Sequence, residues 1–132
     1  MAKSYTVDKI KHDINILNNE IRANEKKLNI TTPGTLDYQI IGCTLQNLYE
    51  RKAGLIHVLE LVNKLISLRE KRAKAYDAYM AFVNKHRGTD NDIICGKVSN
   101  MEDAIGLLDN DIIAVESQLA SLCCTYEYDI SR

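Results

Sequence analysis

Apolar residues recur along this chain at alternating intervals of three and four residues, which is the pattern of helices that pack along one narrow stripe. The pattern runs over residues 6–29, 35–87 and 99–124. It is interrupted by a glycine-containing loop over residues 88–98, and it does not extend into a tail, residues 125–132, that we expect to be frayed. The sequence therefore predicts a single all-α domain with three heptad-patterned helices, of which the central one is very long.

Short polar segments mark the predicted helix ends. Pro33 and Gly34 favour a turn, and Thr35 is a suitable N-terminal cap for the central helix. Ser99 and Glu102 have the spacing of a capping box, which places the start of the third helix at residue 99. The uninterrupted central helix would be about 80 Å long.

The short turns predict that neighbouring helices run in opposite directions, as in an antiparallel bundle or coiled coil. The first helix should lie along the first half of the central helix and the third along its second half, so that both end near Val62. Gly54 is a position at which the central helix could bend, because glycine weakens a helix. Asn24 lies in the apolar stripe of the first helix, where it either fixes the packing register or sits partly exposed.

The apolar face of the central helix becomes broader after Gly54, because a second apolar stripe runs beside the first. A face of this width needs more than one partner helix. Either the helix bends and the chain closes into a compact bundle, or the face is buried between copies of the chain in a homo-oligomer. The long regular heptads favour the homo-oligomer. The residues expected to form this oligomer or partner interface are Val58, Leu61, Leu65, Leu68, Tyr79 and Phe82.

The composition is that of one globular domain. The chain has 132 residues, of which 45% are hydrophobic and 27% charged, and its formal net charge is -1 at pH 7. These values exclude a disordered chain and a strong overall field for nucleic acid or anionic lipid. No apolar run approaches the roughly 20 residues that span a bilayer, and no secretory signal is visible. We therefore expect a cytoplasmic protein with no membrane partner and with its four cysteines reduced.

No group of residues forms a convincing reaction centre or metal site. His57 and Glu60 have a spacing found in the metal sites of helical bundles, but His57 shares its helix face with Lys64, where solvent is expected. Cys95 lies beside Lys97, yet no histidine can be placed next to it from the sequence. We therefore assign no catalytic, cofactor-binding or metal-ligating residue and expect a protein that is not an enzyme.

Chelators and reductants should accordingly leave the folded protein unchanged. A structural metal or a disulfide typically contributes a few kcal/mol or more to stability. The melting temperature followed by circular dichroism should therefore not move with EDTA or dithiothreitol. A fall of several degrees with either reagent would contradict the assignment.

Charge is unevenly distributed over the second half of the chain. Residues 64–87 carry an excess of Lys and Arg with interleaved tyrosines, and residues 88–132 carry an excess of acids. Basic side chains with tyrosines can hold phosphates and stack bases. The residues of this alternative anion-binding site are Arg69, Lys71, Arg72 and Lys74. We favour the other explanation, in which the acidic third helix neutralises the basic stretch.

Pairing of the central and third helices across a short loop predicts specific neighbours for two arginines. It places Arg69 opposite Glu116, and Arg72 opposite Asp111 or Ile112. An ion pair across the helices would leave less positive charge available for a phosphate backbone.

These features favour a non-enzymatic helical protein that binds another protein, such as an adapter, an assembly factor or a small inhibitor. Abundant Ile, Asn, Lys and Tyr point to an A/T-rich genome, for which a bacterial virus is one source. The alternative function is binding of nucleic acid or an anionic nucleotide through residues 64–87. Helix patterns of this kind occur in many unrelated proteins and do not identify the partner.

Overall fold

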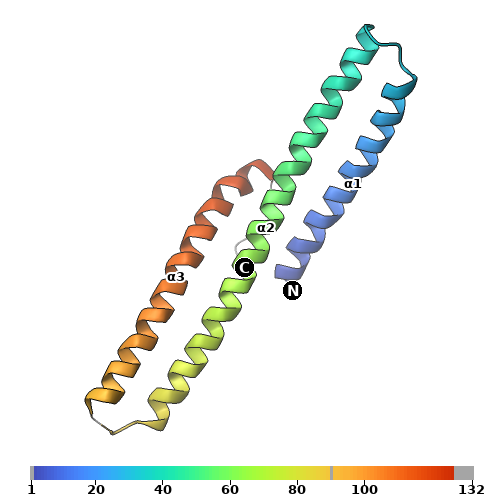
Figure 1. Cartoon of the computed structure of the whole chain (residues 1–132). Helices are drawn as coiled ribbons and strands as arrows, with labels where there is room; N and C mark the ends of the chain where they lie inside the picture. Colours follow the sequence, from blue (N-terminus) through green and yellow to red (C-terminus); the bar gives the residue numbers. More distant parts are fainter. Residues whose placement is uncertain (1, 90, 127–132) are drawn as a thin grey trace.

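The structure, a computed structural model, describes the backbone of residues 2–89 and 91–126. It describes the side chains of residues 7–89 and 91–122. The described residues form helices α1 (Ala2–Ile30), α2 (Leu36–Lys85) and α3 (Asp92–Tyr126). Helix α1 lies along the first half of α2, and α3 lies along its second half (Figure 1). The all-α fold expected from the apolar pattern is therefore confirmed.

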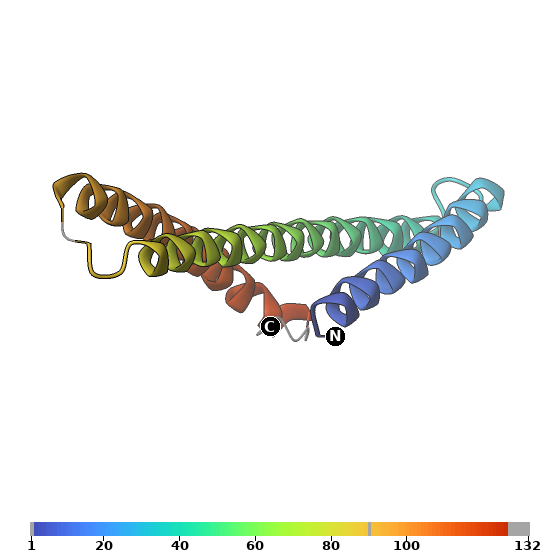
Figure 2. The ribbon, with the colours of Figure 1, turned by 90° about the horizontal axis from the view of Figure 1, so that it is seen from below.

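Helix α2 continues without interruption through Gly54, and its 50 residues rise about 75 Å at 1.5 Å per residue. In Figure 2, α1 and α3 both diverge from the line of α2 toward the same side. The first turns of α1 and the last turns of α3 lie near the middle of α2. The opposite face of α2 carries no described helix and is exposed to solvent.

The turn between α1 and α2 follows directly from its residue types. Gly34 has a φ of 85°, a left-handed conformation that glycine adopts without strain, and Pro33 precedes it as in a type II turn. The Thr35 N–H donates to the Thr32 carbonyl at 3.4 Å. The Thr35 hydroxyl then accepts from the Tyr38 N–H at 3.2 Å, which caps α2 as the sequence predicted.

Helix α3 begins earlier than predicted, at Asp92 instead of residue 99. The Asn91 side chain accepts from the Ile94 N–H at 2.9 Å and so caps the helix, which places Gly96 and the rest of the expected loop from residue 92 onward inside α3. A glycine within a helix costs only about 1 kcal/mol relative to alanine, and packing on α2 offsets that cost. Helix α1 likewise begins at Ala2, before the predicted residue 6.

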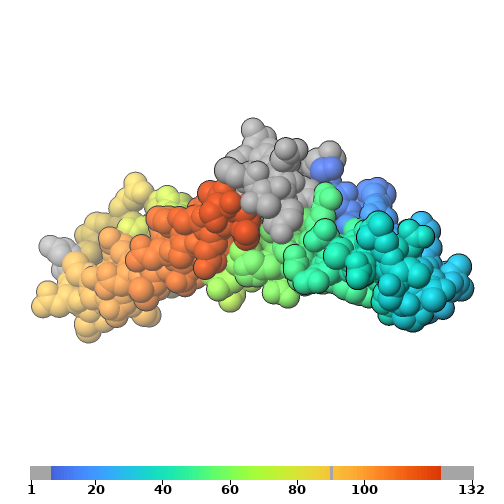
Figure 3. Space-filling view, turned by 90° about the horizontal axis from the view of Figure 1, so that it is seen from above, coloured from blue at the N-terminus to red at the C-terminus, as the bar shows by residue number. Residues whose placement is uncertain are grey.

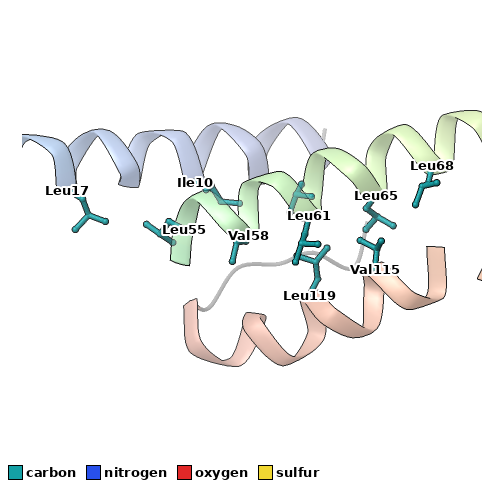
Figure 4. Close-up of a cluster of buried hydrophobic side chains, with 10 residues drawn as sticks. Ile10, Leu17, Leu55, Val58, Leu61, Leu65, Leu68, Val115 and Leu119 are labelled. Atoms are coloured by element: carbon teal, nitrogen blue, oxygen red, sulfur yellow. The ribbon is translucent and has the colours of Figure 1, made fainter. Parts of the chain in front are cut away.

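The core lies where all three helices meet, near the middle of α2 (Figure 4). Two side chains in it are fully inaccessible to solvent, Ile10 from α1 and Leu119 from α3. The buried cluster consists of Ile10, Leu17, Leu55, Val58, Leu61, Val62, Leu65, Leu68, Val115 and Leu119. Asn24 lies outside this cluster, and its side chain donates to the Glu20 carbonyl of its own helix at 2.8 Å in an exposed hydrogen bond.

The molecule is elongated, as the space-filling view shows (Figure 3). Its accessible surface is 9129 Å². A compact monomer of the same mass, 15.0 kDa, would expose about 7,000 Å². The large surface follows from the layout, because each half of α2 is covered by one helix alone.

Candidate interaction surfaces

Four residues of the predicted oligomer interface are buried within a single chain. They are Val58, Leu61, Leu65 and Leu68. Ile10 of α1 and Leu119 of α3 belong to the same cluster and cover them from two directions (Figure 4). The width of the apolar face is thus accounted for by two helices of the same chain. These four side chains have almost no exposed surface to offer a second chain.

The other two residues of that predicted interface, Tyr79 and Phe82, are half-buried. The Phe82 ring centroid lies 4.5 Å from that of His86, and Lys97 Nζ of α3 lies 5.4 Å from the Phe82 centroid. Partial burial raises the pKa of the Tyr79 hydroxyl, as do the negative charge of Glu102 and a hydrogen bond with its carboxylate. The first turns of α3 therefore contact these rings. Sequence reasoning missed this contact because it treated Lys97 as part of a loop.

The predicted ion pair between Arg69 and Glu116 is confirmed. Arg69 Nη2 donates to Glu116 Oε2 at 3.2 Å and joins α2 to α3. The Arg69 side chain is 21% exposed and that of Glu116 is 44% exposed. The guanidinium charge is therefore partly shielded from solvent and already has a partner.

The partner predicted for Arg72 was wrong. Arg72 Nε donates to Asp109 Oδ1 at 3.0 Å, not to Asp111 or its neighbour. The guanidinium carbon lies 5.1 Å from the centroid of the Tyr76 ring. The side chain thus extends along α2 toward Tyr76, where the cation–π contact is favourable, and it meets α3 further from Glu116 than predicted.

The structure divides the four residues of the alternative anion site into two pairs with different surroundings. Arg69 and Arg72 pair with α3, whereas Lys71 and Lys74 are exposed. Two other exposed lysines, Lys64 and Lys85, share a heptad position with Lys71, and Lys74 follows Lys71 by one helical turn. We call Lys64, Lys71, Lys74 and Lys85 the basic face of α2.

Glu116→Ala should lower the free energy of unfolding by about 0.5–1 kcal/mol, because the pair is only partly shielded from solvent. Urea titrations of Glu116→Ala, Arg69→Ala and the double variant would give the coupling energy of the pair. Asp103→Ala, an exposed acid on the same helix, serves as the control. A coupling energy indistinguishable from zero would mean that the ion pair contributes nothing to stability.

Three exposed aliphatic side chains lie at the turn between α1 and α2 and on the first turns of α2. Ile30, Leu36 and Ile40 are 87%, 71% and 55% exposed, and we call them the tip patch. A shallow depression beside them is lined by Lys27, Ile30, Thr31, Asp37, Ile40 and Ile41. The apolar stripes did not reveal the tip patch, because its residues lie beside the stripes or at helix ends.

A second exposed aliphatic region is on α3. Leu107 is 66% exposed, and Ile113 is also exposed, because among the described residues only α2 packs against this part of α3. Asp103 and Asp111 are exposed and lie four residues before and after Leu107, on the same side of the helix. A complementary surface would therefore be apolar with basic residues around it.

Chemical groups of other kinds are scattered over the described residues. The thiols of Cys43 and Cys95 are exposed, and the side chains of Cys123 and Cys124 lie outside the described part. No three His, Cys, Asp or Glu side chains are grouped as metal ligands within residues 7–89 and 91–122. No described helix has a stretch long and apolar enough to cross a membrane.

Comparison with known proteins adds no functional information. No protein-family model, no curated protein and no solved structure matches this chain.

Proposed function

We propose that this chain is a non-enzymatic helical protein that binds another protein, as an adapter, an assembly factor or a small inhibitor. The observation that carries the proposal is the exposure of Leu107 on α3, between two aspartates, on an elongated molecule. Burying a large aliphatic side chain against a partner is favourable by about 1.5–3 kcal/mol. Central apolar residues surrounded by charges are the common layout of protein interfaces.

The proposed partner surface is an apolar pocket with basic residues at its rim. Leu107 would fill the pocket, and the carboxylates of Asp103 and Asp111 would face the basic rim. The proposal includes a cytoplasmic location, where the exposed thiols of Cys43 and Cys95 would stay reduced. It also includes a source with an A/T-rich genome, such as a bacterial virus.

The test is affinity capture from an extract of the source organism or its host, with and without nuclease, followed by mass spectrometry. We expect a protein that is captured by the unmodified chain, is lost with Leu107→Glu and is unaffected by nuclease. Ile16→Glu on α1 makes the same chemical change at another exposed position and should retain the protein. Capture that depends on nucleic acid, or that no variant changes, would count against the proposal.

The basic face of α2 supports a second candidate function, the binding of nucleic acid. Lys64, Lys71, Lys74 and Lys85 are exposed on the helix that carries them. Lys64 and Lys71 lie about 10 Å apart along the helix and Lys71 and Lys85 about 21 Å apart, so they can contact separate phosphates of a strand. Because Arg69 and Arg72 are already paired, this candidate rests on lysines alone.

We expect oligonucleotides to bind weakly and without sequence preference. Four phosphate contacts give a salt dependence under which the affinity falls by about 100-fold between 50 and 200 mM salt. Fluorescence anisotropy with labelled single- and double-stranded oligonucleotides would measure it. Submicromolar binding at physiological salt that is lost on changing all four lysines to alanine, with helicity retained, would make nucleic-acid binding the better account.

A further inference from the structure

The tip patch is the part of the surface least explained by the fold of one chain. Ile30 is the last residue of α1 and Leu36 the first of α2, so both lie beyond the region where the two helices cover each other. Ile40 follows one turn later on α2. Large aliphatic side chains gathered at one place on a surface commonly mark an interaction site. The turn between α1 and α2, which carries the tip patch, lies at one end of the elongated molecule (Figure 3).

Two hydroxyl groups beside the tip patch already have partners within the chain. The Thr31 hydroxyl donates to the Lys27 carbonyl at 2.6 Å, and the Thr35 hydroxyl donates to the Thr32 carbonyl at 2.7 Å. A surface that packs against this end therefore has few hydrogen bonds to supply. Its main requirement is to cover aliphatic carbon.

Two opposite charges border the same depression. Lys27 is in the last turn of α1 and Asp37 is in the first turn of α2. Neither takes part in the ion pairs found between described residues. The region around the depression is thus neutral overall, with a cation on one helix and an anion on the other.

We propose that the tip patch binds the tip patch of a second copy of this chain about a two-fold axis. In a two-fold contact both chains use the same surface, so that surface must be complementary to itself. Here the aliphatic side chains would pack on one another. Lys27 of each copy would face Asp37 of the other. Self-association would then involve the exposed end of the molecule and not the buried middle of α2. Leu107 and the basic face of α2 would remain accessible in the dimer.

The contact is small, so the dimer should be weak. Interfaces that bury less than about 1,200 Å² are typically transient. Sedimentation equilibrium from about 5 to 500 µM should show a monomer at the lowest concentration and a dimer at the highest. Ile30→Ser should shift the dissociation constant upward by at least about tenfold. Ile93→Ser, at a residue that is 82% exposed near the other end, is the matched control and should not shift it.

The decisive experiment uses two charge reversals, Lys27→Asp and Asp37→Lys. Each variant alone places like charges against each other twice in a two-fold dimer, and each should weaken self-association. Mixing the two variants creates a heterodimer in which both contacts again join opposite charges. The mixture should therefore associate more tightly than either variant alone. An ion pair between Lys27 and Asp37 of the same chain could not produce this effect. Each variant would hold two like charges within its own chain, and mixing the two variants would not change that.

Several outcomes would overturn the proposal. The first is an unmodified protein that stays monomeric at about 500 µM. The second is a dimer that Ile30→Ser and both charge reversals leave unchanged. If the unmodified protein is monomeric and Ile30→Ser abolishes capture of a host protein, the tip patch belongs to that protein instead. If the protein does not dimerise but still captures a protein in a way that depends on Leu107, the dimer proposal fails and the proposed function is retained.

Discussion

Leu65→Glu should leave the chain largely unfolded. Leu65 is 2% exposed and belongs to the cluster shared by all three helices. The substitution removes an apolar side chain from the core and introduces a carboxyl group there without a partner. A carboxylate buried there without a partner costs several kcal/mol. If the group takes up a proton instead, it remains a buried polar group without a hydrogen bond, which is also unfavourable. The expected loss exceeds about 4 kcal/mol, against a typical total stability of about 5–15 kcal/mol.

Far-UV circular dichroism and urea titration would measure this loss. Leu107→Glu makes the same change at an exposed position of α3 and should alter stability by no more than about 0.5 kcal/mol. If the middle of α2 were instead an interface between chains, as the width of its apolar face first suggested, Leu65→Glu would release a folded monomer. A helical, monomeric Leu65→Glu protein would therefore contradict the burial of Leu65 within one chain.

The helices could be predicted because their signal is local. Apolar residues at intervals of three and four residues identify a helix wherever they are buried, and they identified all three here. The start of α3 was missed because Gly96 resembles a loop residue, whereas the Asn91 cap and packing on α2 decide its conformation. Local signals therefore located the helices better than their ends.

The ion pairs show how far helix register can be inferred. The short connection between α2 and α3 sets which residues face each other, which is why Arg69 and Glu116 could be paired in advance. The partner of Arg72 could not be predicted, because its long side chain follows the Tyr76 ring to Asp109. Register is a property of the backbone, whereas the path of a flexible side chain depends on all its neighbours.

The interaction surfaces were the least predictable feature. Leu61 and Leu65 looked like interface residues because a broad apolar face needs two partner helices, and the pattern does not say whether those helices belong to the same chain. The structure supplies both from within, through α1 and α3. Ile30 and Leu36 were overlooked for the opposite reason. A search for stripes selects residues that become buried, so it passes over aliphatic residues that stay in solvent.

Leu119→Ala should lower the free energy of unfolding by about 2–5 kcal/mol. Leu119 is fully buried on α3 at the point where α1 and α3 approach the middle of α2. Truncating such a side chain loses its transfer free energy and leaves a cavity that rigid neighbours fill only in part. Urea titration would give the change in stability. Leu107→Ala, on the exposed side of the same helix, should cost less than about 0.5 kcal/mol.

The same experiment tests whether the chain unfolds as one unit. The α1 and α3 helices cover different halves of α2, and the cluster containing Ile10 and Leu119 is where their contacts join. If this cluster couples the two halves, Leu119→Ala should shift a single transition that is the same by circular dichroism and by tyrosine fluorescence. Ile10→Ala, on α1, should shift that same transition by a comparable amount, because Ile10 is equally buried. Two separate transitions, with Leu119→Ala moving only one of them, would mean that α2 carries two independent halves.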